Sequence, residues 1–328
     1  MRKRVILSVL WLLIAGNMTA KRADYTPIST EYEADLGIQQ MTTDKDGVYM
    51  PTVKRSSKKI NWLTNCVVAV SPDGEKLAFL SENNGTTNIF IKNLKDGIQS
   101  PTLQRTNRTQ VLDFAYTPDG KHLLFTDVKA DDCQICQTDA HEGYACEILT
   151  VKQVDYSPAS CTDADEILFA RQQKVSFMIY RYNIKKNNNI TMHAEGFNPC
   201  PIPGENAYVC CRISPQGKSE IWKVDMTTGT EVCIVADPKQ NFSSPRVSPN
   251  GKWITFVGDV KKEYENKKIP NTDIFVCRTD GKAMVQLTDH IADDLSPAWS
   301  PDGKYIYFVS QRGNRQGIAN IWRINLKD

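Results

Sequence analysis

Residues Asp294–Leu326 read DLSPAWSPDGKYIYFVSQRGNRQGIANIWRINL, and this stretch decides the fold. It divides into three short strands separated by turn-forming residues. The segment 300–303 (SPDG) has the residue order of a type I turn, with Ser first, Pro presetting φ at the second position and Gly last. Tyr305–Ser310 is rich in β-branched and aromatic residues, and Asn320–Asn325 alternates as a half-buried strand does. Only two residues follow Leu326, which is too few for a fourth strand. We therefore expect the fourth strand of this unit to come from elsewhere in the chain.

The same unit recurs along the chain. Its turn prolines are 46, 40, 45, 46 and 52 residues apart and are Pro72, Pro118, Pro158, Pro203, Pro249 and Pro301. The strand after each turn carries one aligned core position, held by Phe79, Phe125, Phe169, Val209, Phe256 and Phe308. The segment 214–217 (SPQG) resembles a further anchor, but it falls between strands two and three of the fourth unit. Six repeats of about 40–50 residues predict an all-β, six-bladed β-propeller with four-stranded blades.

The repeat resembles that of the TolB-type propellers, which are built from WD-repeat-like units. Their unit reads aromatic-Ser-Pro-Asp-Gly-Lys and then an aliphatic-Phe strand, and the resemblance covers about Ile60–Leu326. It implies the propeller fold. The same repeat also builds the non-catalytic halves of several peptidases, so the resemblance leaves the function open.

The N-terminal residues have the composition of an export signal. Residues 1–20 combine a basic start, an apolar run of eleven residues at Val5–Ala15 and a small-residue cleavage site at Met18–Ala20. A run of eleven is too short to cross a bilayer, which needs about 20 residues. We therefore expect a secreted or periplasmic protein with no transmembrane span after signal cleavage. Residues 21–58 form a polar leader, and residues 59–328 form the propeller.

The segment Lys59–Thr64 (KINWLT) is predicted to close the ring. It resembles the ends of two fourth strands, Cys146–Thr150 and Met284–Thr288, and lies at the same distance from the next turn proline. We expect it to be the N-terminal outer strand of the last blade. Such closure pairs the two ends of the chain and removes an open sheet edge.

No catalytic motif and no metal or cofactor motif stands out. The four histidines, His122, His141, His193 and His290, fall in different repeats. Among the ten cysteines, Cys133 and Cys136 have metal-like spacing but share a strand, where such positions face opposite ways. Disulfides such as Cys136–Cys146 or Cys200–Cys210 are possible, and the sequence does not fix them. The balance of 40 basic against 38 acidic residues argues against nucleic-acid binding.

Cations gather in the predicted loops between strands two and three. Three of these loops carry two cations and no acid, and they supply the candidate ligand-binding residues Arg171, Lys174, Arg212, Lys218, Arg312 and Arg315. The fifth repeat adds a long loop at Gly258–Thr272 with four lysines. We expect an exported, monomeric, non-catalytic interaction module that docks a protein or an anionic envelope ligand on this face. Two alternatives stay open: a carbohydrate-active hydrolase or lyase at the channel mouth, and a regulatory propeller for a separately encoded peptidase.

Overall fold

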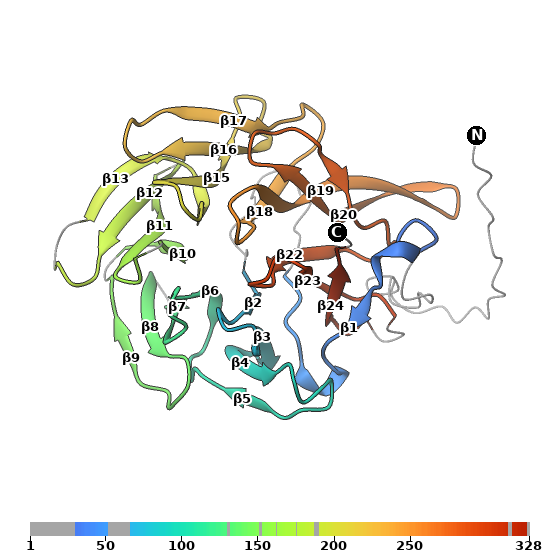
Figure 1. Ribbon diagram of the computed structural model, residues 1–328, viewed down its shortest axis with the longest axis horizontal. Coiled ribbons are helices and arrows are strands. Elements are labelled where there is room, and N and C mark those ends of the chain that lie inside the picture. Colours follow the sequence, from blue (N-terminus) through green and yellow to red (C-terminus); the bar gives the residue numbers. More distant parts are fainter. Residues whose placement is uncertain are drawn as a thin grey trace.

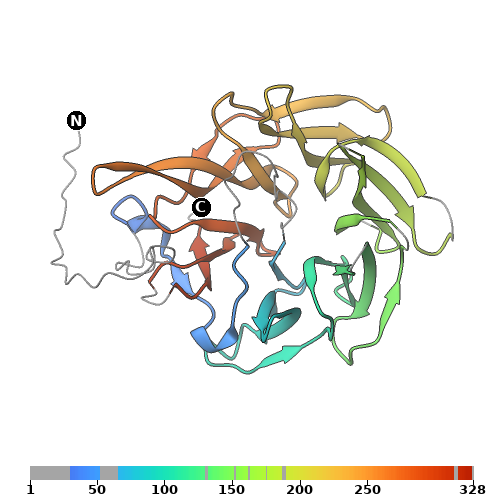
Figure 2. The ribbon, with the colours of Figure 1, turned by 180° about the vertical axis from the view of Figure 1, so that it is seen from behind.

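The computed structural model describes residues 30–51, 66–129, 132–150, 153–161, 163–174, 176–186, 190–313 and 317–326. Within these ranges the chain forms six antiparallel sheets of four strands each. The sheets stand around a central axis as the blades of a propeller, and the two opposite views show the same ring (Figures 1 and 2). The predicted all-β, six-bladed architecture is confirmed.

Each blade is a meander whose first strand lies nearest the axis. The first three blades, from inner to outer strand, are β2 (Val68–Val70), β3 (Lys76–Asn83), β4 (Thr86–Asn93) and β5 (Thr102–Gln104); β6 (Val111–Tyr116), β7 (His122–Val128), β8 (Cys133–Asp139) and β9 (Cys146–Ile148); and β10 (Asp155–Ser160), β11 (Glu166–Gln173), β12 (Ser176–Asn183) and β13 (Ile190–Glu195). The last three are β14 (Phe197–Pro201), β15 (Ala207–Ile213), β16 (Ser219–Asp225) and β17 (Glu231–Val235); β18 (Phe242–Val247), β19 (Trp253–Tyr264), β20 (Lys267–Arg278) and β21 (Val285–Gln286); and β22 (Asp294–Trp299), β23 (Tyr305–Ser310), β24 (Asn320–Asn325) and β1 (Gln39–Gln40).

The Ser-Pro-Asp-Gly segments form the turns between first and second strands. In the first blade the Ser71 hydroxyl accepts a hydrogen bond from the Lys76 amide, and the Asp73 carboxylate accepts one from the Glu75 amide. Gly74 has φ +74°, a left-handed conformation that glycine adopts without a side-chain clash. The turn side chains therefore satisfy the backbone groups that a tight reversal leaves unpaired.

The aligned phenylalanines form the repeating core, and all five are fully buried. The fourth blade differs by one residue from the predicted alignment. There Cys200 of β14 pairs with Val209, whereas Ala159 of β10 pairs with Leu168, the residue before the core Phe169. Cys210, rather than Val209, therefore holds the phenylalanine position of the fourth blade. It is fully buried, as its counterparts are.

Pro158 is not a turn proline, which corrects the third repeat anchor. It lies inside the inner strand β10, where the register shifts between Tyr156 and Ala159. The turn that follows is built around Asp163, whose carbonyl accepts from the Glu166 amide at 3.0 Å. The dipeptide Ser-Pro therefore serves two structures in this chain, a turn between strands and a bulge within the inner strand.

The outer strand of the last blade comes from the N-terminal part of the chain, but not from the predicted residues. β1 (Gln39–Gln40) pairs antiparallel with β24 opposite Arg323 and Trp322. Lys59–Thr64, the segment predicted for this place, lies outside the described residues. Two glutamines carry none of the apolar alternation that marks a strand in a sequence, so this short outer strand gave no signal.

The same N-terminal segment also contacts the first blade. The Tyr49 amide donates to the Leu80 carbonyl, and the Glu82 amide donates to the Gly47 carbonyl. Asp46 accepts from the nearly buried ammonium group of Lys92 at 2.9 Å. The segment therefore bridges the last and first blades, as the blue trace between β24 and β3 in Figure 1 shows.

The predicted signal and the two ends of the predicted leader cannot be compared with the structure. Residues 1–29 and 52–65 lie outside the described ranges. Residues 30–51, which belong to the predicted leader, pack on the propeller. The described part of the chain contains no helix with the length and apolar character needed to cross a membrane.

Candidate functional site

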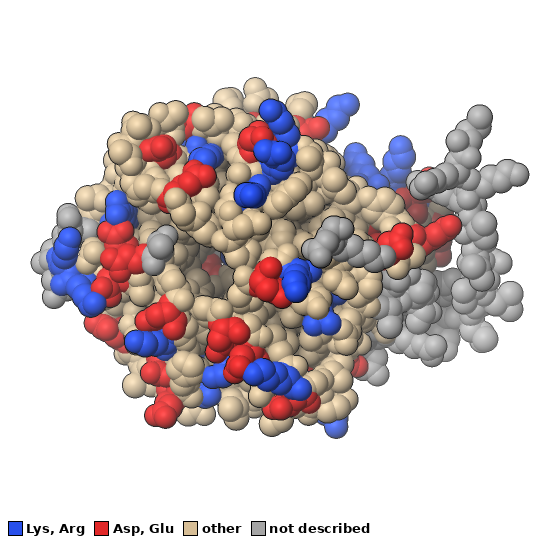
Figure 3. All heavy atoms as spheres, viewed as in Figure 1, with Lys and Arg blue, Asp and Glu red and all other residues tan. Residues whose placement is uncertain are grey.

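The inner strands surround a cavity in the central channel. It holds about 180 Å³ and is lined by residues of β6, β10, β14 and β18, together with Cys66 just before β2. Figure 3 shows a hollow near the centre of the face turned toward the viewer, with acidic and basic side chains interspersed around it. This cavity is a concave site that could hold a ligand, so the residues that line it decide what could bind there.

A bulge in each of four inner strands shapes the channel wall. The bulged residue has a positive φ of 53° to 56° and precedes a proline; the four are Ser157, Asn198, Ser244 and Ser296. Such values are uncommon outside glycine, and bulges re-aim side chains. The Ser157 hydroxyl lies 3.1 Å from the Asn198 amide oxygen, and the Val67 amide donates to the Ser296 hydroxyl at 2.9 Å. The bulges thus connect neighbouring blades around the axis.

Asp113 occupies the corresponding place in the second blade. Its carboxylate accepts from the Thr126 hydroxyl and from the backbone amide of Ser157 in the third blade. Burial raises the pKa of Asp113 to about 6, against hydrogen bonds from Thr126 and Ser157 and the attraction of Arg246, which lower it. Asp113 therefore joins two blades and carries its charge mainly above pH 6.

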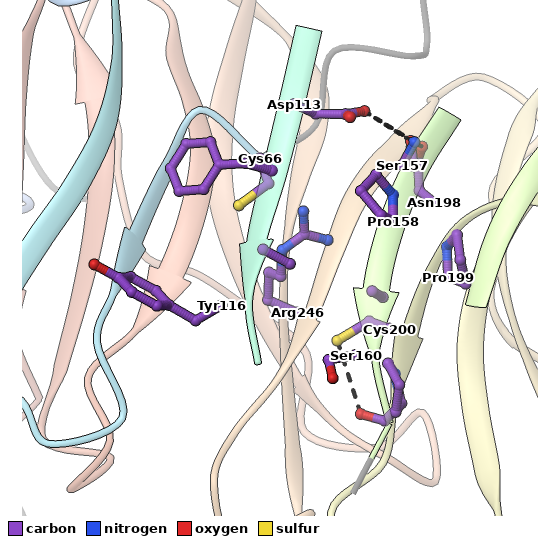
Figure 4. Close-up of a pocket in the computed structure, with 14 residues that line it drawn as sticks. Cys66, Asp113, Tyr116, Ser157, Pro158, Ser160, Asn198, Pro199, Cys200 and Arg246 are labelled. Atoms are coloured by element: carbon purple, nitrogen blue, oxygen red, sulfur yellow. Dashed lines mark hydrogen bonds between the residues drawn. The ribbon is translucent and has the colours of Figure 1, made fainter. Parts of the chain in front are cut away.

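Arg246 is the cation of the cavity. Its side chain lies between the strands that carry Asp113 and Ser157, with Cys66 and Cys200 on either side of it in Figure 4. Burial raises the pKa of both thiols above their ordinary value even though Arg246 opposes this shift. Both thiols are therefore protonated at neutral pH, and the guanidinium is the charged donor that faces the cavity.

Two of the predicted ligand-binding cations are paired within their own blades. Arg171 donates to both carboxylate oxygens of Asp155 and lies 4.8 Å from the ring centroid of Tyr180. Arg212, at the same position of the fourth blade, pairs with Glu231 at 2.6 Å and stacks over Trp222. Each guanidinium is already paired with a carboxylate and stacked on an aromatic ring of its own blade. These two arginines therefore stabilise the blades instead of presenting free charges to a ligand.

Arg312 was predicted as a surface cation, and this prediction is wrong. Its side chain is fully buried and pairs with the equally buried carboxylates of Glu33 and Asp294. The sequence placed Arg312 in a polar loop without an acidic neighbour. Its partners come from the inner strand of the same blade and from the N-terminal segment, so no local pattern reveals them.

The remaining predicted cations differ in exposure. Lys174 is exposed in the turn between β11 and β12. Lys218 is half-buried beside β16, and its ammonium group donates to the Lys239 carbonyl at 3.2 Å. Arg315 lies outside the described residues. The structure therefore brings Lys174 and Lys218 to the surface on adjacent blades, and no single cationic cluster joins the described members of the predicted set.

The lysine-rich segment Gly258–Thr272 was predicted to be a loop, and this prediction is wrong. The segment is the extension of a β-hairpin. β19 and β20 pair residue by residue out to Tyr264 and Lys267, and the hairpin projects beyond the ring (Figure 1). The reversal uses Glu265 and Asn266, both at positive φ, as a two-residue hairpin turn requires. Within it, Lys262 pairs with the buried Asp273 and with Asp289.

The cysteines and histidines do not assemble into a metal-type cluster. Within the described ranges no group of three His, Cys, Asp or Glu side chains is placed to hold a metal ion. All ten cysteines are free thiols, so neither Cys136–Cys146 nor Cys200–Cys210 forms a disulfide. Among the residues that line the cavity there is one arginine and one tyrosine, but no histidine or glutamate.

A ring of six four-stranded blades around a lined channel defines the protein as a six-bladed β-propeller. The TolB beta propeller domain family matches residues 35–211 and 205–328. The chain therefore belongs to the TolB β-propeller family, as the repeat pattern implied.

Known proteins agree with this assignment at the level of the fold. An uncharacterised protein of Agrobacterium fabrum is 29% identical over 108 residues, which is 33% of each protein. The crystal structure of TolB from Acinetobacter baumannii is similar with a TM-score of 0.61 and 16% identity, over 78% of this chain and 64% of that one. A putative TolB from Agrobacterium tumefaciens has a TM-score of 0.59 and 16% identity, over 82% and 94%. The chain thus spans about a third of the first relative's length and less than two thirds of the Acinetobacter chain.

Proposed function

We propose that the protein is an exported, non-catalytic propeller that docks a protein or a cell-envelope ligand. The docking face consists of the turns between second and third strands in the third and fourth blades. The observation that carries this proposal is the exposure of Lys174, of Ile213 and of the Lys218 ammonium group at these turns of two adjacent blades. Ile213 is 39% exposed, although isoleucine is usually buried. An exposed apolar side chain together with cations is typical of a surface that contacts another protein.

The charges under this face favour an acidic partner. Arg171 and Arg212 are neutralised by Asp155 and Glu231, so they add little net charge at the surface. The ammonium groups of Lys174 and Lys218 have no carboxylate within ion-pair distance among the described residues. Two uncompensated positive charges steer an acidic patch toward the turns and make binding salt-dependent.

Export is the second part of the proposal. It rests on the basic start and short apolar run of residues 1–20. Protein taken from its native host should have a mature N-terminus at or near Lys21 by mass spectrometry. An intact Met1 in a cytosolic fraction would refute the proposed compartment while leaving the docking face to be tested separately.

The docking face is tested by charge reversal on each of the two opposite faces of the propeller. The variant Lys174→Glu/Lys218→Glu should capture less of the native partner than the wild-type protein and should show a flatter salt dependence. The matched control is Lys252→Glu/Lys304→Glu, because these exposed lysines lie in turns between first and second strands, on the opposite face. The control should bind as the wild type does. Equal binding by the test variant, with an unchanged melting temperature, would contradict the proposed face.

A further inference from the structure

Arg246 breaks a pattern of small side chains around the channel. At the inner-strand position that pairs with the residue before the core phenylalanine, four of the other five blades have alanine and one has cysteine. These residues are Ala69, Ala115, Ala159, Cys200 and Ala298. In the fifth blade the same position, opposite Thr255, is Arg246. Five small residues leave space in the channel, and a single long cationic side chain extends into it.

The guanidinium of Arg246 lacks an ion-pair partner among the described residues. One of its nitrogens, Nη1, donates to the Pro245 carbonyl at 2.8 Å, and the guanidinium also hydrogen-bonds to the Cys66 thiol. Three other half-buried or buried arginines differ, since Arg171, Arg212 and Arg312 each have a carboxylate within 3 Å. A cation out of bulk water without a counterion is costly, and an anion that enters the cavity removes that cost.

Asp113 does not fill this role. It lies close enough to attract Arg246, but its two oxygens are engaged by the Thr126 hydroxyl and the Ser157 amide. In Figure 4 its carboxylate points toward Ser157 and Asn198 at one end of the cavity, away from the guanidinium. The N–H groups of Arg246 that Pro245 and Cys66 do not use therefore remain available to a ligand.

We propose that the channel cavity binds the carboxylate group of a small organic acid against Arg246. A planar guanidinium matches a carboxylate with two parallel hydrogen bonds. One cation suits a monoanion, and the nearby Asp113 charge disfavours a dianion such as phosphate. The walls contributed by Pro158, Ala159 and Pro199 are apolar, so they suit the short hydrocarbon part of such an acid. The cavity volume of about 180 Å³ limits the ligand to a few heavy atoms. This site is independent of the proposed docking face.

Calorimetric titration of the whole protein tests the proposal with three probes of similar size. Propionate should bind saturably with a dissociation constant on the order of millimolar. Propionamide, which has the same shape without the charge, should not bind, and inorganic phosphate should bind more weakly than propionate. The variant Arg246→Gln should lose at least about tenfold in affinity for propionate. The control Arg278→Gln removes an exposed arginine on the protein surface and should bind as the wild type does.

Two further variants keep the test decisive if Arg246→Gln fails to fold. Ala159→Leu retains the guanidinium but fills the cavity, so it should abolish propionate binding. Asp113→Asn removes the repelling charge and keeps an acceptor for Thr126, so it should tighten propionate binding at pH 7.5. Absence of saturable propionate binding by the wild type up to about 100 mM would overturn the proposal. Equal binding by Arg246→Gln, or tighter binding of phosphate, would overturn the assignment of the ligand.

Discussion

The guanidinium of Arg312 donates hydrogen bonds to both carboxylate oxygens of Glu33, a residue 279 positions earlier in the chain. Asp294 accepts a further bond from the same guanidinium, and all three side chains are fully buried. Burial acts to raise the pKa of Glu33, but the attraction and hydrogen bonds of Arg312 outweigh it and hold the pKa below its ordinary value. The N-terminal segment is therefore fastened to the last blade by a buried charge network as well as by β1.

Replacing Arg312 by methionine should destabilise the fold strongly. The methionine fills much of the volume but leaves two buried carboxylates without a counterion, a change that costs about 3–5 kcal/mol in the free energy of unfolding. Chemical denaturation at pH 7 measures this difference. In the control Arg278→Met, the arginine is 57% exposed and its ion pair with Asp280 is worth less than about 1 kcal/mol. Similar losses in both variants would show that the buried network contributes no special stability.

The regular part of this architecture follows from the sequence. The aligned phenylalanines and the Ser-Pro-Asp-Gly turns are local patterns that recur along the chain. The sequence therefore predicts six blades, and it places Phe79, Phe169 and Phe308 correctly in the core. Pro158 shows the limit of this reasoning, because Ser-Pro also occurs in an inner-strand bulge, and only the pairing with Leu168 and Ala170 separates the two uses.

The long-range contacts do not follow from the sequence. Glu33 and Arg312 are far apart in the chain and share no repeat position, so nothing local predicts that they meet. The prediction of a cationic face was wrong at Arg312 for the same reason. Carboxylates from two other segments of the chain neutralise this loop arginine. Arg246 was missed because the inner strands are short and the bulge obscures their alternation. Its signal is the Ser-Pro dipeptide that precedes it, as in β10 and β22.

The stability of the protein should fall as pH rises through the titration of Asp113. The carboxyl of an unfolded chain loses its proton near pH 3.8, whereas the buried Asp113 keeps its proton until about pH 6. Between these values the folded state binds more protons, so rising pH removes stability. A shift of about two pKa units corresponds to about 3 kcal/mol.

The variant Asp113→Asn isolates this contribution. It cannot titrate, so the difference in free energy of unfolding between variant and wild type should change by about 3 kcal/mol in the variant's favour between pH 4 and pH 7. Any loss of hydrogen bonding in the variant adds a constant offset, and the low pKa of Glu33 affects both proteins alike. A difference that does not change with pH would contradict the assigned shift.

Adding a methyl group at Gly258 should strain the fifth blade. A Cβ built there would lie 2.7 Å and 2.9 Å from ring atoms of Phe275, closer than real contacts allow. Phe275 also packs against Phe256 and Phe242, so the ring has little freedom to move. Gly258→Ala should therefore cost about 1–3 kcal/mol in the free energy of unfolding. In the double variant with Phe275→Leu the smaller side chain relieves the clash. The loss in the free energy of unfolding of the double variant should therefore be smaller than the sum of the losses of the two single variants.

The buried hydroxyl of Thr42 should contribute to closure of the ring. It donates to the Asn320 amide oxygen and accepts from the Ile321 amide at 2.8 Å. Thr42→Val keeps the shape but leaves the Ile321 amide buried without a partner, which costs about 1–3 kcal/mol. The matched control is Thr86→Val, because the Thr86 hydroxyl makes a solvent-exposed bond to the Asn83 carbonyl. Thermal unfolding of the two variants side by side should show a clear loss for the Thr42 variant alone.

Removal of residues 21–51 should destabilise the whole ring, although the composition of this segment predicted only a polar leader. The deletion takes away β1 from the edge of β24, and it leaves Lys92, whose side chain is 2% exposed, without Asp46. It also removes Glu33 from the buried guanidinium of Arg312. Loss of buried partners at both ends of the ring should lower the melting temperature by about 10–20 °C.

A shorter deletion of residues 21–29 provides the comparison for this effect. It retains every contact between residues 30–51 and the blades, so calorimetry should give the melting temperature of the full mature chain. If the two deletions melt alike, the contacts of Glu33 and Asp46 do not support closure, and the ring must be held by the pairing of consecutive blades alone. If only the longer deletion melts early, the first and last blades depend on this segment, because residues 30–51 hydrogen-bond to both blades.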